Sequence, residues 1–161
     1  MTTKKLDFSI PILGEAKISS PIMMSTTQND GQADYVNDAD HILFGIDTDI
    51  DENGHPVPRD EETVEVAGPR AKIYFNPAHV HAAITTCGGI CPGLNNVIRA
   101  VVRCFWYRYG VRRISGVQFG YQGLLENSPW PLIPLDPDVV DDIQEKGGTI
   151  LGSARGGGKQ V

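Results

Sequence analysis

The hydrophobic pattern of the chain changes its period between residues 82 and 105. Residues 82–86 are small, apolar or β-branched and end at Gly88-Gly89, which is typical of a buried strand. After Pro92 the apolar residues follow a helical spacing and form one stripe, made of Leu94, Val97, Ile98, Val101, Val102 and Phe105. Gly110 stands where a helix C-cap is expected. The pattern therefore predicts a strand, a glycine turn and a helix.

The remainder of the chain predicts two further strands and one more helix. Residues 114–119 form a second strand, and a glycine turn follows at residues 120–124. Asp136-Pro137-Asp138 is a typical helix start, with a capping carboxylate and a proline at the first position. Val139, Val140 and Ile143 would form the buried face of this helix, Gly147-Gly148 would end it, and the short strand 149–151 would follow. The alternation predicts an α/β fold, a three-layer Rossmann-like domain with a mostly parallel sheet.

Residues 1–66 are polar and show no sustained helical period. Residues 42–46 could form a short strand, with Asn53-Gly54 as the turn between it and residues 64–66. We expect an acidic extension that packs on the domain formed by residues 67–161, with partial disorder around Asp30 and Asp60 as the alternative.

Charge divides the chain in the same way. Residues 1–68 carry 14 acidic and 4 basic residues, whereas residues 69–161 carry 6 acidic and 10 basic residues. The acidic part argues against nucleic-acid binding, and the basic part suits small phosphorylated ligands. No apolar run is long enough for a membrane span, and the first residues lack a signal-peptide core. Three cysteines in such a chain favour the reducing cytoplasm.

Two metal sites can be considered and rejected. The acids at positions 47, 49 and 51 begin like a calcium-binding loop, but Glu52 replaces the glycine and Pro58 replaces the final glutamate that such a loop needs. Cys87 and Cys91 lie near His79 and His81, but a closed zinc site needs four ligands in tetrahedral reach, and His81 would point along the predicted strand while Cys104 falls on the predicted helix. We predict an acidic turn in the first case and small buried thiols in the second.

The glycine turn suits phosphate binding. Glycines let an anion approach the backbone closely, and the helix that follows presents N–H groups without intrahelical partners at the positive end of its dipole. The alternative is a turn in which the glycines serve only the geometry. The dinucleotide fingerprint does not match residues 88–93, and a P-loop is excluded because Gly158-Lys159 precedes Gln160.

Three sequence blocks carry a resemblance to a known family. Residues 88–95, 120–124 and 147–157 resemble, in order and spacing, the amino-terminal third of the 6-phosphofructokinases. Residues 67–75 and 86–89 resemble the plant-type, ATP-dependent branch. The match runs from about Ala67 to the last residue, and the preceding residues match only loosely.

The resemblance implies an incomplete phosphofructokinase N-terminal domain. It implies a cytoplasmic glycolytic enzyme that transfers the γ-phosphoryl group of ATP, with Mg²⁺, to fructose 6-phosphate and is a homo-oligomer at full length. The nucleotide and phosphate site would include Gly88, Gly89, Tyr121, Arg155 and Gly156. Arg155 would bind the transferring phosphate; without the resemblance, a surface arginine in a flexible tail is an equal alternative.

Two parts of the family's machinery do not occur in this sequence. The family binds magnesium through a Gly-Gly-Asp-Gly block and uses a later aspartate as base, and neither motif occurs before Val161. We therefore expect no catalytic residue and no metal ligand in this chain, and an inactive fragment. A pyrophosphate-dependent enzyme of the same superfamily and a non-catalytic phosphate-binding module remain as alternatives.

Overall fold

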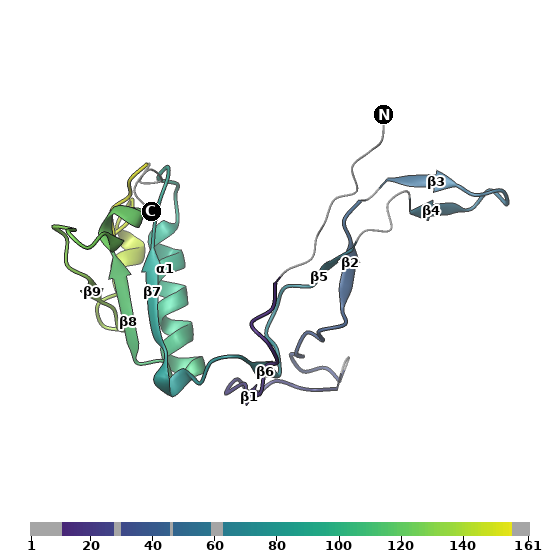
Figure 1. Ribbon diagram of the computed structural model, residues 1–161, viewed down its shortest axis with the longest axis horizontal. Coiled ribbons are helices and arrows are strands. Elements are labelled where there is room, and N and C mark those ends of the chain that lie inside the picture. Colours follow the sequence, from purple (N-terminus) through teal and green to yellow (C-terminus); the bar gives the residue numbers. More distant parts are fainter. Residues whose placement is uncertain (1–10, 28–29, 46, 59–62, 156–161) are drawn as a thin grey trace. The chain divides into compact units, whose positions relative to one another are not determined.

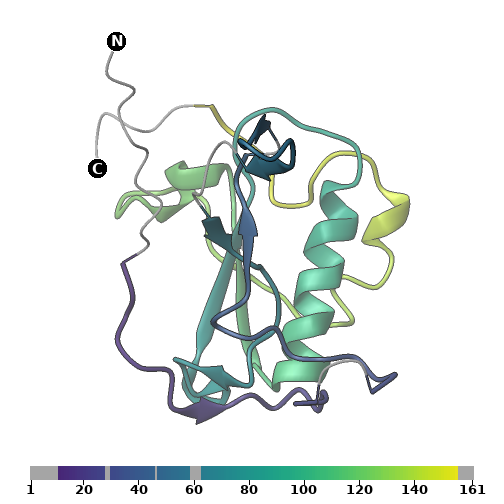
Figure 2. The same cartoon turned by 90° about the vertical axis from the view of Figure 1, so that its right-hand side faces the viewer.

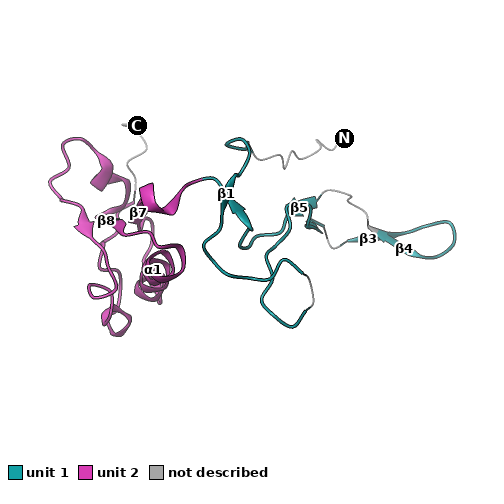
Figure 3. Cartoon of the chain, turned by 90° about the horizontal axis from the view of Figure 1, so that it is seen from below, with its two compact units in different colours: residues 1–74 teal, residues 75–161 magenta. Residues whose placement is uncertain are grey.

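The structure is a computed structural model that describes residues 11–27, 30–45, 47–58 and 63–155. The chain divides into two compact units, residues 1–74 and residues 75–161, which are coloured separately in Figure 3. Within the described ranges, no helix has the length and apolar character needed to cross a membrane.

Residues 1–74 form short antiparallel strand pairs. β1 (Ile18–Ser19) pairs with β6 (Lys72–Ile73), β2 (His41–Leu43) with β5 (Thr63–Glu65), and β3 (Thr48–Ile50) with β4 (Pro56–Pro58). The β2–β5 pair confirms the predicted pairing of residues 42–46 with residues 64–66, although Ile46 itself lies outside the described residues.

The turn at Asn53-Gly54 closes a different hairpin from the one predicted. It joins β3 to β4, so this hairpin is inserted between the two strands that the sequence pattern connects directly. The Oδ1 atom of Asp51 accepts hydrogen bonds from the N–H groups of Asn53 and His55, at 2.9 and 2.8 Å. The acidic segment thus forms a turn that its own carboxylate stabilises.

The second unit contains a three-stranded sheet in the order β7-β8-β9. β7 (His81–Thr85) follows the short helix η1 (Pro77–His79) and runs parallel to β8 (Arg113–Val117), as the arrows in Figure 1 show. The sequence predicted both of these strands. It did not predict β9 (Ile133–Pro134), which pairs antiparallel with β8. The described residues contain one parallel pair and one α-helix, so the predicted three layers of a mostly parallel sheet are not assembled in them.

The predicted helix is present as α1 (Leu94–Arg103), which continues as the π-helix η2 (Cys104–Tyr109). Figures 1 and 2 show α1 running alongside β7 and β8. Gly93 and Gly110 cap the two ends with left-handed φ values of 91° and 72°. The predicted stripe is only partly buried, because Val97 is 59% exposed.

The core of the second unit joins α1, β8 and the irregular segment 135–151. Its buried members are Ile98, Val102, Val111, Ile114, Leu135, Val140, Ile143 and Leu151. On α1 the buried face follows Asn95, Ile98 and Val102, because the segment 140–151 packs on that side. This face explains why Val97 lies outside the core.

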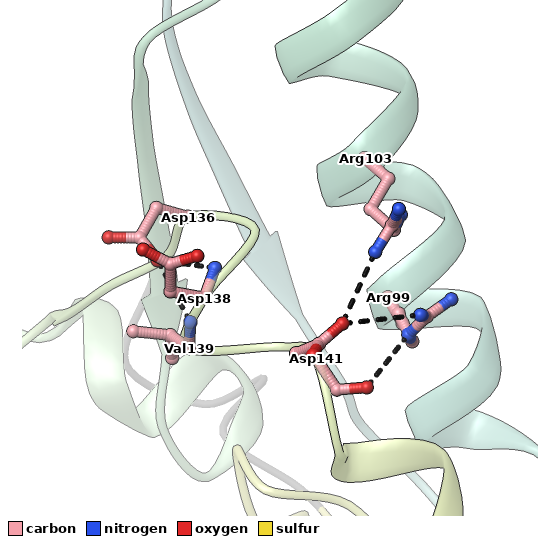
Figure 4. Close-up of polar contacts among 6 residues, drawn as sticks. All are labelled: Arg99, Arg103, Asp136, Asp138, Val139 and Asp141. Atoms are coloured by element: carbon pink, nitrogen blue, oxygen red, sulfur yellow. Dashed lines mark hydrogen bonds and ion pairs between the residues drawn. The ribbon is translucent and has the colours of Figure 1, made fainter.

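The helix predicted from Asp136 does not form. Its cap is present, since Asp136 Oδ1 accepts the N–H groups of Asp138 and Val139 at 3.0 and 2.9 Å (Figure 4). Only the short 3₁₀ helix η4 (Ile143–Glu145) follows, Val139 is 43% exposed, and residues 149–151 form a turn rather than the predicted strand.

Contacts with α1 explain this difference. Arg99 Nε donates to the carbonyl oxygen of Asp141 at 3.1 Å, and the guanidinium groups of Arg99 and Arg103 contact the Asp141 carboxylate (Figure 4). The segment is also short enough for an isolated helix to be marginal. Carbonyl groups that a helix would use internally therefore bond to α1 instead.

Asn95 is the buried polar residue that fixes this segment to α1. It is 2% exposed, its Nδ2 donates to the carbonyl oxygen of Lys146 at 2.9 Å, and its Oδ1 accepts the N–H of Ile150 at 2.9 Å. The side chain thus satisfies a donor and an acceptor that residues 146–150 do not pair among themselves.

We expect Asn95→Ala to lower the free energy of unfolding by about 1–3 kcal/mol, because it leaves two main-chain groups without partners. Urea denaturation followed by circular dichroism measures this loss. The matched control is Asn96→Ala on the exposed face of the same helix turn, which should change stability by less than about 0.5 kcal/mol. Equal losses in the two variants would contradict the role of Asn95.

A second prediction concerns the pH dependence of Asp142. A side-chain hydrogen bond from Lys146, followed by the charge of Lys146, holds the pKa of the Asp142 carboxyl below its usual value. Its contribution to stability is therefore present above the ordinary carboxyl pKa and is lost as the pH falls through the lowered value. NMR titration should show this low midpoint, and Lys146→Gln should raise it. Arg103→Gln removes an ion-pair partner of Asp141 and not of Asp142, so it should leave the Asp142 midpoint unchanged. An Asp142 midpoint that does not change in Lys146→Gln would refute the assignment of the low pKa to Lys146.

Candidate functional site

Three turns meet at the carboxyl ends of β7 and β8. The first turn, residues 86–93, follows β7, and the second turn, residues 118–124, follows β8 and contains the short helix η3 (Gly120–Leu124). Because the two strands are parallel, their carboxyl ends lie at the same edge of the sheet, the edge at which α/β proteins bind ligands. The third turn, residues 149–155, reaches this edge from the far end of the described chain.

Hydrogen bonds join the first turn to the third turn. Thr86 Oγ1 donates to the carbonyl oxygen of Gly152 at 2.7 Å. The N–H of Gly88 donates to the carbonyl oxygen of Ala154 at 3.2 Å, and Ser153 Oγ donates to the carbonyl oxygen of Gly88 at 2.7 Å. These bonds hold the third turn beside the end of β7 without a strand pairing.

The hydroxyl of Thr149 adds one further bond. Thr86 gives its only hydroxyl hydrogen to Gly152, so Thr149 is the donor in the 3.0 Å contact between the two Oγ1 atoms. Thr149 Oγ1 in turn accepts the N–H of Leu151 at 3.2 Å. The chain of hydroxyl bonds leaves both threonines satisfied.

The second turn contacts both of the others through Phe119 and Gly120. A Cβ atom on Gly120 would lie 3.1 Å from the Cβ of Cys87 and 3.4 Å from the carbonyl oxygen of Thr86, so the second turn packs closely against the first turn. The N–H of Phe119 donates to the carbonyl oxygen of Leu151 at 2.8 Å. All three turns are therefore in direct contact.

Phe119 adopts a left-handed φ of 56°, the only described residue other than glycine with a positive φ. Its ring packs against Trp130 with the centroids 4.5 Å apart. It also lies so close to Gly152 that an added Cβ would be 2.7 Å from the ring. Strained residues of this kind persist where the surrounding packing fixes them, and they concentrate at functional sites.

The structure brings together three of the sequence-predicted site residues. Gly88 has a left-handed φ of 85°, which favours glycine. At Gly89 a Cβ would lie 3.4 Å from Nη2 of Arg155, so the guanidinium group lies directly beside the glycine backbone. Tyr121 lies on η3 with 57% of its surface exposed, and Gly156 lies outside the described residues.

The start of α1 adds N–H donors to this edge. Gly93 caps the helix without a side-chain hydrogen bond, and the first turn of the helix contains no acidic residue. The N–H groups of that turn therefore keep their partial positive charge, as the sequence predicted for an anion site.

The prediction of buried thiols is wrong. Cys87 and Cys91 are both exposed, because the first turn lies at the surface and Ile90 between them is also 65% exposed. In the parts of the chain that the structure describes, no group of three or more His, Cys, Asp or Glu residues is arranged to hold a metal ion. The hydroxyl groups of Thr86, Thr149 and Ser153 donate within the turns, so the donors left for a ligand are the guanidinium group of Arg155 and the N–H groups at the start of α1, which suit an anion.

The sequence pattern assigns no roles to Thr86, Ser153 and Phe119. The hydroxyl residues that flank the glycines were a usable signal, because such side chains commonly bond to nearby backbone groups. Nothing local marks the left-handed conformation of Phe119, which depends on its contacts with Leu151 and Trp130.

Comparison of the sequence with known proteins identifies a family and several relatives. Residues 81–160 match the phosphofructokinase family. The chain is 52% identical over 158 residues to the ATP-dependent 6-phosphofructokinase of Borreliella burgdorferi and 43% identical over 158 residues to that of Amycolatopsis methanolica. It is also 55% identical over 91 residues to ATP-dependent 6-phosphofructokinase 7 of Arabidopsis thaliana, a match that covers 56% of this chain and 18% of the relative.

The matches differ in extent. The two bacterial matches cover 98% of this chain, so the aligned region includes most of residues 1–66, whereas the Arabidopsis match covers 56%. The chain spans about a third of the length of the two bacterial relatives, 34% in each case. The chain belongs to the phosphofructokinase family.

Proposed function

We propose that the three turns form the phosphate-binding part of the nucleotide site of an ATP-dependent 6-phosphofructokinase. The enzyme would transfer the γ-phosphoryl group of ATP to fructose 6-phosphate and give fructose 1,6-bisphosphate. The observation that carries the proposal is the position of Arg155, whose guanidinium group lies beside Gly89 where the three turns meet. The names of the bacterial relatives support the choice of ATP and of the reaction.

The proposed roles follow from the chemistry of the groups. The backbone at Gly88 and Gly89 offers no side chain to obstruct a phosphate, and the start of α1 adds N–H donors. Arg155 would fork onto two phosphate oxygens and stabilise the charge of the transferring group. Phosphoryl transfer depends mainly on such positioning and charge stabilisation.

Tyr121 and Gly156 complete the proposed nucleotide site. The exposed ring of Tyr121 lies on the second turn, where it would flank the nucleotide. Mg²⁺ would accompany ATP and offset the phosphate charge, but the donors at the three turns do not fit a metal ion. We propose that its ligands belong to the Gly-Gly-Asp-Gly block that the family resemblance implies.

The wider setting is also a proposal. Residues 67–161 would be the first part of a three-layer α/β domain with a mostly parallel sheet, preceded by the acidic extension 1–66. Such an enzyme would be a homo-oligomer of the cytoplasm. The parallel pair β7–β8 supports this fold, because right-handed crossovers through α1 are the repeating unit of such sheets.

The Arg155→Gln variant tests whether the guanidinium group beside Gly89 binds ATP. We expect it to weaken ATP binding, measured by isothermal titration calorimetry, about tenfold or more, because a charge-assisted hydrogen bond is worth about 1.5–3 kcal/mol. The matched control is Arg108→Gln in η2, an exposed arginine remote in sequence from the three turns, which should leave the affinity unchanged. Equal affinities of the Arg155→Gln variant and the unaltered chain would refute the assignment.

The same titration with pyrophosphate separates the two phosphoryl donors. Tighter binding of ATP than of pyrophosphate, with both weakened by Arg155→Gln, is the expected result for an ATP-dependent enzyme. Tighter binding of pyrophosphate would overturn the choice of donor while leaving the position of the phosphate site in place.

Gly89→Ala tests the close approach of the phosphate. The φ of Gly89 is not positive, and the new Cβ would make ordinary contact with Arg155 at 3.4 Å, so we expect the fold to be retained. The methyl group would occupy the space beside the guanidinium, and ATP affinity should fall. Gly147→Ala, which meets nothing within 4 Å, should leave both stability and affinity nearly unchanged. ATP affinity that is unaffected by Gly89→Ala would exclude direct phosphate contact there.

A further inference from the structure

A second cluster of cationic side chains lies at the opposite end of the sheet from the three turns. β7 begins at His81, and β8 begins at Arg113. A cavity of about 340 Å³ lies there, and its lining includes these two residues together with Trp106, Arg112, Ser115 and Asp136. Five-residue strands separate this cavity from the three turns by about 15 Å. We call it the amino-end pocket.

Arg112 is held in place by an aromatic ring rather than by an acid. Its guanidinium carbon lies 4.5 Å from the centroid of the Trp106 ring. Stacking of this kind fixes the plane of the guanidinium and leaves the N–H groups at its edge available. Within the described ranges, Arg112 has no carboxylate in ion-pair contact.

Arg113 and His81 form a hydrogen-bonded pair that reaches Ser115. A guanidinium can only donate, so the 3.4 Å contact makes His81 Nδ1 the acceptor from Arg113 Nη2. The proton of the neutral imidazole then lies on Nε2, which donates to Ser115 Oγ at 2.8 Å. The pair orders Arg113 without neutralising its charge.

The hydroxyl of Ser115 retains an unused donor. Ser115 is 8% exposed, and its oxygen accepts from His81, so its own hydrogen has no acceptor among the residues that the structure describes. A buried donor of this kind favours an acceptor supplied by a ligand or a water molecule.

Other arginines of the chain have acidic partners. Arg70 pairs with Asp38, and Arg99 and Arg103 both pair with Asp141. The single acid that lines the amino-end pocket, Asp136, instead uses Oδ1 to accept two N–H groups of its own turn (Figure 4). The pocket therefore combines two guanidinium charges, one carboxylate charge, an aromatic wall and a buried hydroxyl, and its side chains carry a net positive charge.

From these contacts we propose that the amino-end pocket binds a phosphate group of a small molecule, at a site separate from the three turns. Two guanidinium forks match a tetrahedral dianion in charge and in hydrogen-bond geometry, and the Ser115 hydroxyl supplies a third donor. The proposal does not depend on the nucleotide site proposed above.

Trp106 provides a specific reporter for this site. The chain contains two tryptophans, so in the Trp130→Phe variant the remaining fluorescence comes from Trp106, which lines the pocket. Titration of the full chain with inorganic phosphate, at constant ionic strength, should give a saturable change in that fluorescence. The Arg113→Gln variant keeps the Arg112–Trp106 stack and should raise the dissociation constant about tenfold.

Two control variants distinguish binding in the amino-end pocket from binding at the three turns and from a general effect of lost positive charge. Arg155→Gln should leave the Trp106 response unchanged, because it alters only the three turns, and Arg108→Gln should leave it unchanged because Arg108 does not line the pocket. Far-UV circular dichroism of each variant verifies that it is folded, and Arg112→Lys, which keeps the charge but not the fork, should also weaken binding.

The outcomes that overturn the proposal are distinct. A response that is not saturable, that survives Arg113→Gln, or that is lost equally in Arg108→Gln refutes a specific site in the amino-end pocket. A response that disappears only in Arg155→Gln assigns phosphate to the three turns and removes this proposal. ATP binding at the three turns can fail while the Trp106 response remains, so the two proposals fail independently.

Discussion

Hydrogen bonds between the first and third turns take the place of a strand pairing that the third turn does not have. The bonds of Thr86 and Gly88 fix its carboxyl half, and those of the buried Asn95 fix its beginning. Between these two anchors the segment is irregular, so its position depends on side-chain and main-chain polar groups rather than on a ladder. The place of Arg155 beside Gly89 follows from this attachment.

The contacts that hold this segment also prevent residues 136–146 from forming the predicted helix. Residues 136–146 carry the cap and the apolar spacing of a helix, yet main-chain carbonyls of this segment accept hydrogen bonds from Arg99 and Asn95 of α1. A short helix in isolation is marginal, so a few tertiary hydrogen bonds and the burial of Val140 and Ile143 outweigh its internal bonding. Tertiary contacts here override a local preference, as they commonly do.

The elements that the sequence predicted correctly have strong local signals. β7, α1 and β8 have a clear hydrophobic period and lie next to glycine turns; Gly93 caps the start of α1, and Gly110 caps the end of its continuation η2. β9 is two residues long, and no local pattern distinguishes so short a strand. Within the site, Gly88 and Ser153 are 65 residues apart, and only the family resemblance, not periodicity, connected their two segments. The exposure of Val97 depended on which face of α1 the irregular segment covers.

The two ends of the sheet have the same electrostatic character for different structural reasons. At the carboxyl ends, the positive charge comes from the N–H groups at the start of α1 and from Arg155. At the amino ends it comes from Arg112 and Arg113, which outnumber the single acid there, Asp136. A solvated guanidinium without a carboxylate partner costs the fold little, because exposed ion pairs contribute little stability. Such residues can therefore keep free N–H groups for a ligand. Coupling between the two ends requires an element with two arrangements that both ligands bias. β7 and β8 are in register over all five residues, a single arrangement, so we expect the two proposed sites to bind their ligands independently.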